Sequence, residues 1–247
     1  MNYLLTLQYD GSGYHGWQRQ ENAVTVQKCV ETAVTKLFGH PATVYGCSRT
    51  DTGVHANCFK CNFHSDVVRP LNRVVTGMNF FLPEDIAVTS AALVPEAFNA
   101  RFDCVSKQYI YRIYNTPVRN PFYKQKAMHY YLPLDASFLD AQAKDFIGTH
   151  DFTAFRASGA TVQTTVRTVM AAGVTRVGDE VIFSVQADGF LYNMVRIMVG
   201  TLLYISEGKI EAGTIPDIIL SEDRLRAGKT AEPCGLYLNA VNYKEGY

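Results

Sequence analysis

Segments with the two-residue periodicity of strands alternate with segments of helical periodicity along the whole chain, and this alternation constrains the fold most. The predicted strands are residues 3–9, 43–47, 58–63, 86–94, 105–114, 166–176, 181–188 and 236–243. The predicted helices are residues 24–38, 70–81, 136–147, 193–207 and 216–220. The element order is similar in the two halves, without a flexible linker between them. The sequence therefore predicts an α+β fold of two units that share an extended sheet.

The composition is that of an ordinary globular protein, with 247 residues, 47% hydrophobic and 19% charged. The amino terminus lacks the basic region and the long apolar run of a signal peptide. The most apolar later segment, residues 194–205, is too short to span a bilayer and contains Arg196. We therefore expect a cytoplasmic protein with no membrane association.

The formal net charge of zero argues against a generally basic nucleic-acid coat, but basic residues are concentrated between residues 101 and 126. Six Lys and Arg side chains there are opposed by Asp103 alone, and six Tyr and Phe rings are interleaved with them. Such a mixture suits phosphate contacts and base stacking. Taken alone, the pattern favours a solvated edge strand whose charges prevent aggregation, and the RNA-binding interpretation stays open beside it.

The six cysteines are scattered, and one pair, Cys58 and Cys61, has CxxC spacing. The pair falls in a predicted strand, where an odd offset places the two side chains on opposite faces. No second CxxC or HxxxH accompanies it. We expect free thiols and no metal site.

Residues 11–16 read Gly-Ser-Gly-Tyr-His-Gly and satisfy the GxGxxG pattern directly after a predicted strand. A dinucleotide site needs a helix that opens at these glycines and an acidic residue after the next strand. Here the helical pattern begins only near Val24, and the next strand ends at Cys47 and Ser48 without a carboxylate. We therefore expect no nucleotide cofactor.

The segment from Tyr45 to Ala56 places one carboxylate, Asp51, beside Arg49 in a Gly- and Thr-rich turn. An ionised, partly desolvated Asp beside an arginine can act as a nucleophile or a base. Asp and Gly are also common in turns that only connect strands. Local chemistry does not decide between these two interpretations.

Residues 49–56 read Arg-Thr-Asp-Thr-Gly-Val-His-Ala, which resembles the Gly-Arg-Thr-Asp-Ala-Gly-Val-His-Ala signature of the tRNA pseudouridine synthase A family. Residues 9–18 similarly match the family's opening Tyr-Asp-Gly-x-x-(Phe/Tyr)-x-Gly-Trp-Gln motif. Further blocks resemble the family in the same order, at residues 82–86, 98–102, 107–111, 150–155, 189–196 and 233–238. Each string is short, but their order along the whole chain is specific.

The resemblance implies the pseudouridine synthase fold: two ferredoxin-like units with one extended, mostly antiparallel sheet and helices on one side. The first half, residues 1–104, would carry Asp51, and residues 105–247 would carry Tyr109 and Arg196, with the active-site cleft between the halves. The implied reaction isomerises uridine to pseudouridine at positions 38, 39 and 40 of the tRNA anticodon stem-loop. It needs no cofactor, and members of the family are homodimers.

By resemblance, Asp51 is the catalytic carboxylate, Arg196 pairs with it, and Tyr109 stacks on the target uracil. Taken alone, Arg196 also suits an exposed helix face, and Tyr109 an ordinary strand aromatic. Arg49 matches a family arginine that replaces the flipped nucleotide, although a turn-stabilising salt bridge would also explain it. The predicted RNA-binding residues are Arg49, Arg19, Arg101, Lys107 and Tyr111.

Three positions depart from the family pattern: Ser48 replaces Gly, Thr52 replaces Ala, and Asn99 replaces a common His. They affect fine positioning and leave the carboxylate in place. The alternative function is a non-catalytic RNA-binding protein, although no strand carries the aromatic signature of a base-stacking RRM sheet. A glycosidase-like hydrolase would need a second acid, and no paired carboxylate is evident near Asp51.

Overall fold

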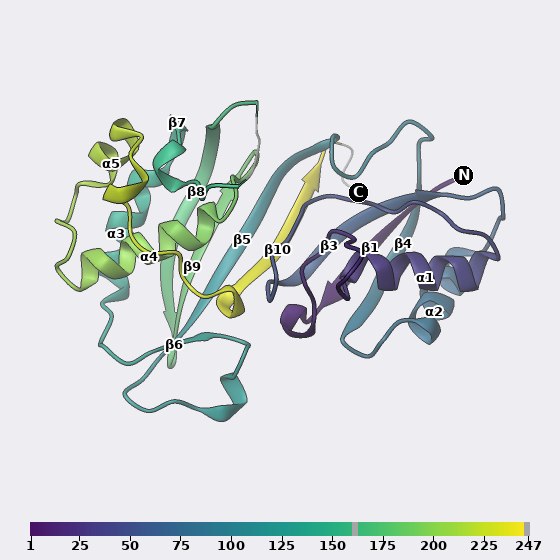
Figure 1. The fold of residues 1–247 in the computed structure, drawn as a ribbon, viewed down its shortest axis with the longest axis horizontal. Coiled ribbons are helices and arrows are strands. Elements are labelled where there is room, and N and C mark those ends of the chain that lie inside the picture. The colour runs from purple at the N-terminus through teal and green to yellow at the C-terminus, as the bar shows by residue number, and fades with distance from the viewer. Residues whose placement is uncertain (160–162, 245–247) are drawn as a thin grey trace. The chain divides into compact units, whose positions relative to one another are not determined.

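The computed structural model describes residues 1–159 and 163–244, which form two compact units (Figure 1). The first unit contains Met1–Val105 and the end of the chain from Tyr237, and the second contains Ser106–Leu236. The predicted second half includes residues 160–162 and 245–247, which lie outside the described residues.

The sheet of the first unit is built around β1 (Asn2–Tyr9), whose side chains are almost all buried. It pairs antiparallel with β3 (His55–His64) on one side and with β4 (Ile86–Val94) on the other. The short β2 (Tyr45–Gly46) pairs antiparallel with β3, whereas β10 (Leu236–Tyr243) is parallel to β3. The last strand of the chain thus completes the first unit.

Two helices of the first unit, α1 (Val26–Phe38) and α2 (Leu71–Phe81), lie side by side (Figure 1). The hydroxyl of Thr25 caps α1 by accepting the Lys28 amide at 3.4 Å, and Gly39, in the left-handed conformation with φ 81°, ends it. The apolar face of α1 is buried, as its helical periodicity requires.

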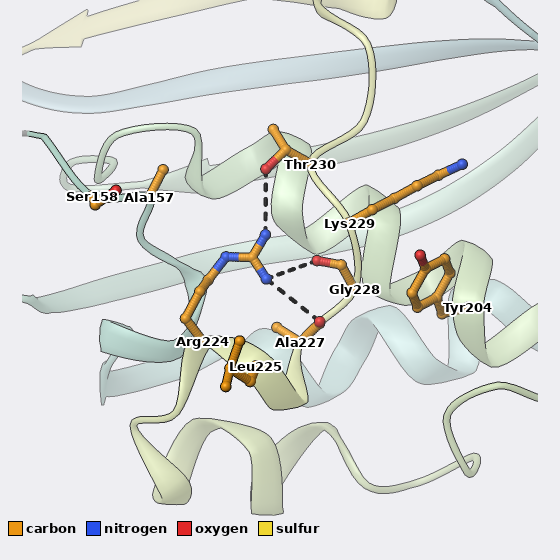
Figure 2. Close-up of a pocket in the computed structure, with 9 residues that line it drawn as sticks. All are labelled: Ala157, Ser158, Tyr204, Arg224, Leu225, Ala227, Gly228, Lys229 and Thr230. Atoms are coloured by element: carbon orange, nitrogen blue, oxygen red, sulfur yellow. Dashed lines mark hydrogen bonds between the residues drawn. The ribbon is translucent and has the colours of Figure 1, made fainter.

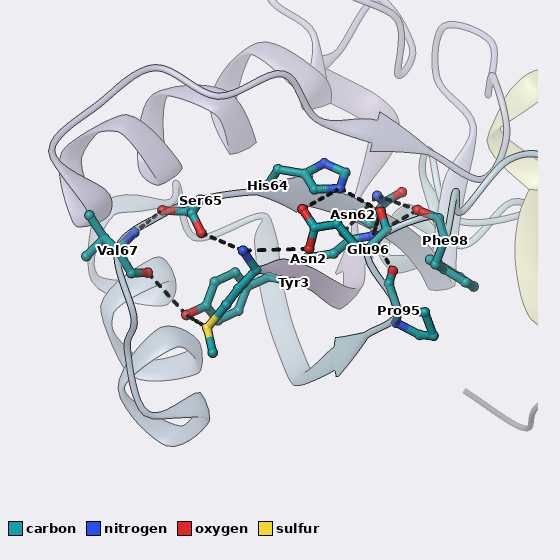
Figure 3. Close-up of polar contacts among 10 residues, drawn as sticks. Asn2, Tyr3, Asn62, His64, Ser65, Val67, Pro95, Glu96 and Phe98 are labelled. Carbon is teal, nitrogen blue, oxygen red and sulfur yellow. Dashed lines mark hydrogen bonds and ion pairs between the residues drawn. The ribbon is translucent and has the colours of Figure 1, made fainter.

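Two buried amides, Asn2 on β1 and Asn62 on β3, tie the strands to the loop that follows β4 (Figure 3). Asn62 Nδ2 donates to Asn2 Oδ1 at 2.9 Å, and Asn2 Nδ2 donates to the Phe98 carbonyl at 2.8 Å. The Ala100 amide donates to Asn62 Oδ1 at 2.8 Å. Each buried amide thus forms hydrogen bonds with backbone groups of the loop that follows β4.

The sheet of the second unit runs β5 (Cys104–Asn115), β9 (Glu180–Ala187), β8 (Val166–Val177) and β7 (Gly148–Asp151). These neighbours are antiparallel, and β6 (Met128–Tyr130) adds a short parallel pairing to β5. β8 and β9 form a hairpin that turns at Gly178 and Asp179.

The helices of the second unit are α3 (Ala136–Ala143), α4 (Met194–Ser206) and α5 (Ile215–Ser221). α3 packs on β8 and on α4, and α4 is buried along most of its length. Short 3-10 segments occur at Gly11–Gly13, Pro121–Tyr123, Lys144–Phe146, Thr153–Phe155, Arg224–Arg226 and Pro233–Gly235.

The structure confirms the α+β class and the mostly antiparallel pairing within each unit. Several predicted boundaries differ: the strand predicted at residues 43–47 is only β2, and the helix predicted at 136–147 ends at Ala143, where 3-10 geometry begins. The short strands β6 and β7 were not predicted. The division at residue 104 lies one residue from the observed boundary, but β10 joins the first unit.

No helix among the described residues is long and apolar enough to cross a membrane. Over the same residues, no group of three or more His, Cys, Asp and Glu side chains is placed to hold a metal ion.

Candidate active site

Asp51 lies in an irregular turn between β2 and β3 of the first unit, and its side chain is half-buried. The Val54 amide donates to the Asp51 carbonyl at 3.1 Å, and Gly53 between them has φ 77°. Gly53 allows this positive φ because it has no Cβ. The carboxylate therefore projects from a tight turn whose own backbone is hydrogen-bonded.

The loop that follows β1 holds this turn on both sides of Asp51. The Trp17 amide donates to the Thr50 carbonyl at 3.1 Å, and the Gly53 amide donates to the Tyr14 carbonyl at 3.3 Å. The buried Thr50 hydroxyl lies 2.8 Å from the Tyr9 hydroxyl. Because Thr50 and Gly53 are both held, contacts within the first unit restrain the backbone on either side of Asp51.

Two glycines of the GxGxxG pattern allow this close approach. A Cβ on Gly11 would lie 1.9 Å from the Val54 carbonyl oxygen, and a Cβ on Gly16 would lie 2.3 Å from the Thr50 carbonyl oxygen. Helix α1 begins well after them, at Val26. The glycines thus serve backbone contact with the Asp51 turn, which explains the motif without a phosphate ligand.

A buried histidine, His55, follows the turn at the start of β3. Its Nδ1 lies 3.0 Å from Asp10 Oδ1 and 3.1 Å from the Gly11 nitrogen. Its ring stacks on Tyr237 of β10 with centroids 4.5 Å apart. Asp10 also caps the 3-10 segment at Gly11–Gly13 by accepting the Ser12 amide. His55 and Asp10 therefore join the two loops that surround Asp51.

Tyr14 anchors the same loop from the other side by donating its hydroxyl to the Asp85 carboxylate. Burial, followed by the hydrogen bond to Asp85, raises the pKa of Tyr14 well above its usual value. The hydroxyl therefore keeps its proton well into the alkaline range. The indole of Trp17 stacks on Phe59 with centroids 4.0 Å apart, which fixes the loop to β3.

In the second unit, Arg196 lies in the first turn of α4 and is half-buried. Its Nε donates to the Ala231 carbonyl at 2.7 Å, and its Nη1 donates to Asn193 Oδ1 at 2.6 Å. Asn193 precedes the helix with φ 60°, in the left-handed region that Asn tolerates. Two fixed acceptors thus orient the guanidinium, in contrast to the alternative of a solvent-exposed helix arginine.

Tyr109 and Tyr111 are two residues apart on β5, so their side chains lie on one face of the strand together with that of Lys107. Tyr109 is buried and meets Phe190 edge to face at 5.0 Å. Tyr111 is fully buried and donates its hydroxyl to the Glu232 carbonyl at 2.6 Å. Tyr111, predicted to bind RNA, is therefore part of the core of the second unit.

The other predicted RNA-binding residues are more exposed. Arg49 is exposed in the same turn as Asp51. Arg19 is exposed near α1, with its Nη1 3.6 Å from Glu31 Oε2. The exposed Arg101 lies over the Phe102 ring, with its guanidinium carbon 5.5 Å from the centroid. Lys107 is half-buried on β5.

Sequence reasoning missed the supports of the two predicted site residues. The Asp51 turn is held by Thr50 and by the Asp10–His55 pair, through contacts between segments far apart in the chain. Arg196 is held by Asn193, whose backbone is left-handed. The sequence offered one signal for these supporting residues: they lie within the motifs at residues 9–18, 49–56 and 189–196. Their partners follow only from the fold.

A family model described as tRNA pseudouridine synthase matches residues 6–103 and 142–244. The chain belongs to the tRNA pseudouridine synthase family. Among its relatives in this family, the tRNA pseudouridine synthase A of Thermoanaerobacter sp. (strain X514) is 42% identical over 242 residues, which cover 98% of this chain and 99% of the relative.

Other members of the tRNA pseudouridine synthase family are similarly close over nearly their whole length. The tRNA pseudouridine synthase A of Ruminiclostridium cellulolyticum is 43% identical over 97% of this chain and 98% of its own. That of Methylacidiphilum infernorum (isolate V4) is 41% identical over 98% and 96%. The expected membership of the family, and with it of an isomerase class of enzymes, is confirmed.

Proposed function

We propose that this chain isomerises uridine to pseudouridine at positions 38, 39 and 40 of the anticodon stem-loop of tRNA. The observation that carries the proposal is the Asp51 turn, in which a half-buried carboxylate is held on both sides by the loop after β1. A carboxylate whose backbone is already fixed reacts without the entropy cost of ordering a loop. The relatives named tRNA pseudouridine synthase A support the choice of substrate.

The reaction breaks the bond between C1′ of the ribose and N1 of the uracil and forms a bond between C1′ and C5. N1 gains a proton and C5 loses one to the solvent, so no oxidant, reductant or hydrolytic water is consumed. Asp51 supplies the carboxylate that this exchange requires. The chemistry uses side chains of this chain and needs no cofactor.

In this proposal, three other residues act on the same nucleotide. Arg196 pairs with Asp51 and keeps it ionised against desolvation. Tyr109 stacks on the target uracil. Arg49, exposed in the Asp51 turn, contacts RNA at the place that the flipped nucleotide leaves, which offsets part of the few kcal/mol that base flipping costs.

The remaining expectations concern the setting of the enzyme. We propose a cytoplasmic homodimer, in which two chains of zero formal charge combine local basic surfaces to bind one polyanion. Arg19, Arg101 and Lys107 supply such positive charge in our proposal.

Mapping of pseudouridine in a transcribed tRNA tests the proposal. The RNA is incubated with the protein, treated with a carbodiimide that marks pseudouridine, and read by primer extension. We expect stops at uridines 38, 39 and 40. A matched transcript with cytidine at these three positions should give none.

Two other outcomes have distinct meanings. Stops elsewhere in the tRNA would keep the reaction class but overturn the positional assignment. Tight binding of tRNA without any stop would favour the alternative of a non-catalytic RNA-binding protein.

A further inference from the structure

Residues 227–231, here called the strap, run along α4 and end beside Arg196. The Ala231 amide donates to the Arg196 carbonyl at 3.1 Å, and the Arg196 Nε donates back to the Ala231 carbonyl at 2.7 Å. A strap backbone oxygen therefore accepts a hydrogen bond from the Arg196 guanidinium. Any displacement of the strap would move this acceptor and reorient Arg196.

The other end of the strap packs against α4 at Gly200, one helical turn after Arg196. A Cβ on Gly200 would lie 1.7 Å from the Lys229 carbonyl oxygen, and a Cβ on Gly228 would lie 2.3 Å from the Gly200 oxygen. The Gly228 amide donates to the Thr201 hydroxyl at 2.9 Å, and that hydroxyl donates to Ile197 at 2.8 Å. Backbone thus meets backbone without side chains between them.

Arg224 holds the strap from outside the helix, in the wall of an open pocket (Figure 2). Its Nη1 donates to the Gly228 carbonyl at 2.9 Å and to the Ala227 carbonyl at 3.4 Å, and its Nη2 donates to the Thr230 hydroxyl at 3.3 Å. Figure 2 shows the guanidinium turned toward these three residues. A planar fork with several donors can fix a loop in a way that a single ammonium cannot.

We propose that Arg224 is a positioning residue for the reaction, because it fixes the strap and the strap in turn orients the Arg196 guanidinium. This inference rests on the proposed function. The Arg224 guanidinium donates to Ala227, Gly228 and Thr230, which all belong to the strap. In this proposal Arg224 therefore acts through Arg196 rather than on the nucleotide. Thr201 has the same role from the helix side.

The test compares Arg224→Ala, Arg224→Lys and Thr201→Val with the control Arg226→Ala. Arg226 lies on the same 3-10 segment, is exposed, and donates to the Asp217 carbonyl at 3.3 Å, away from the strap. The measurements are the single-turnover rate constant for pseudouridine formation in transcribed tRNA, the Kd for that tRNA, and the melting temperature.

We expect Arg224→Ala to lower the single-turnover rate constant by about ten-fold or more while the Kd changes by less than about two-fold. Arg224→Lys should recover part of the rate because it retains a positively charged donor nitrogen, although not the planar fork of the guanidinium. Arg226→Ala should match the wild type. If Arg224→Ala does not fold, Thr201→Val tests the strap instead, because it removes the acceptor of the Gly228 amide without a change of charge. We expect it to lower the rate constant in the same way.

A double-mutant cycle with Arg196→Lys separates positioning from loss of structure. If Arg224 acts through Arg196, Arg224→Ala should lower the rate of the Arg196→Lys enzyme by less than about two-fold. Independent effects that multiply, or a wild-type rate in both Arg224→Ala and Thr201→Val, would overturn the inference. A wild type that forms no pseudouridine would instead overturn the proposed function, and this inference with it.

Discussion

The backbone amide of Trp17 donates to the carbonyl of Thr50 at 3.1 Å, which attaches the residue before Asp51 to the loop after β1. The Trp17 ring is itself buried and stacks on Phe59 of β3 at 4.0 Å. Trp17 thus connects the Asp51 turn to the apolar core of the first unit. The position of the carboxylate consequently depends on packing well away from it.

The contact between Gly11 and Val54 predicts a strong effect of one added methyl group. In Gly11→Ala the new Cβ would need to share space with the Val54 carbonyl oxygen, so the Asp51 turn must shift. We expect pseudouridine formation to fall by about ten-fold or more, because displacement by about 1 Å at a reacting group is costly. Turnover on transcribed tRNA measures the effect.

The matched control is Gly13→Ala in the same 3-10 segment. Its Cβ would lie 3.9 Å from Asp85 Oδ2, an ordinary contact, so activity should stay within about two-fold of the wild type. Equal activity of the two variants would show that the close contact does not position Asp51.

The buried amide network predicts that Asn62→Leu destabilises the first unit. The substitution leaves the Ala100 amide and Asn2 Oδ1 without their present partners, so we expect the free energy of unfolding to fall by roughly 3 kcal/mol. Urea unfolding measures it. Asn57→Ala on the same strand is the control: Asn57 is exposed, and its bond to Asn239 should contribute little. Comparable losses in both variants would contradict the assignment.

The ion pair between Arg112 and Glu180 predicts a pH-dependent contribution to stability. Arg112 Nε and Nη2 donate to the two carboxylate oxygens at 2.7 and 2.8 Å, and this pairing lowers the pKa of Glu180 below its usual 4.5. The carboxylate binds its proton more readily in the unfolded chain. Its stabilisation is therefore complete above about pH 4.5 and is lost as the pH falls through the lower folded pKa.

Urea unfolding of the wild type and Glu180→Gln between about pH 3 and 7 measures this contribution. The wild type should be the more stable at neutral pH, and the difference should shrink below about pH 4.5. A difference that stays constant over the whole range would mean that the charge of Glu180 does not matter.

The longer helices and strands of the fold followed from the periodicity of their apolar residues. The helix from Val26 to Phe38 was predicted within two residues, because its apolar positions recur at helical spacing and Thr25 caps it. The strand β7 (Gly148–Asp151) was missed, because its four residues carry no apolar alternation and it is held by pairing with β8. Local pattern does not encode such pairing.

The sequence nominates site residues but not the groups that hold them. Asp51 and Arg196 were predicted because they lie in motifs that resemble the family's, whereas their supports come from distant segments: Tyr9 beside Thr50, and Ala231 beside Arg196. The environment of Tyr111 could not be predicted either. Its place in a basic and aromatic stretch suggested RNA contact, and in the structure the ring is buried and its hydroxyl donates to the Glu232 carbonyl.

The most direct test of the central claim is tritium release from tRNA transcribed with uridine labelled at C5, with wild type and Asp51→Asn compared at equal tRNA occupancy. Asn retains the size of Asp and removes the charge, so folding and tRNA affinity should be preserved. We predict release by the wild type and none above background by Asp51→Asn. Release by Asp51→Asn at the wild-type rate would contradict the account, because the carboxylate would then have no part in the reaction.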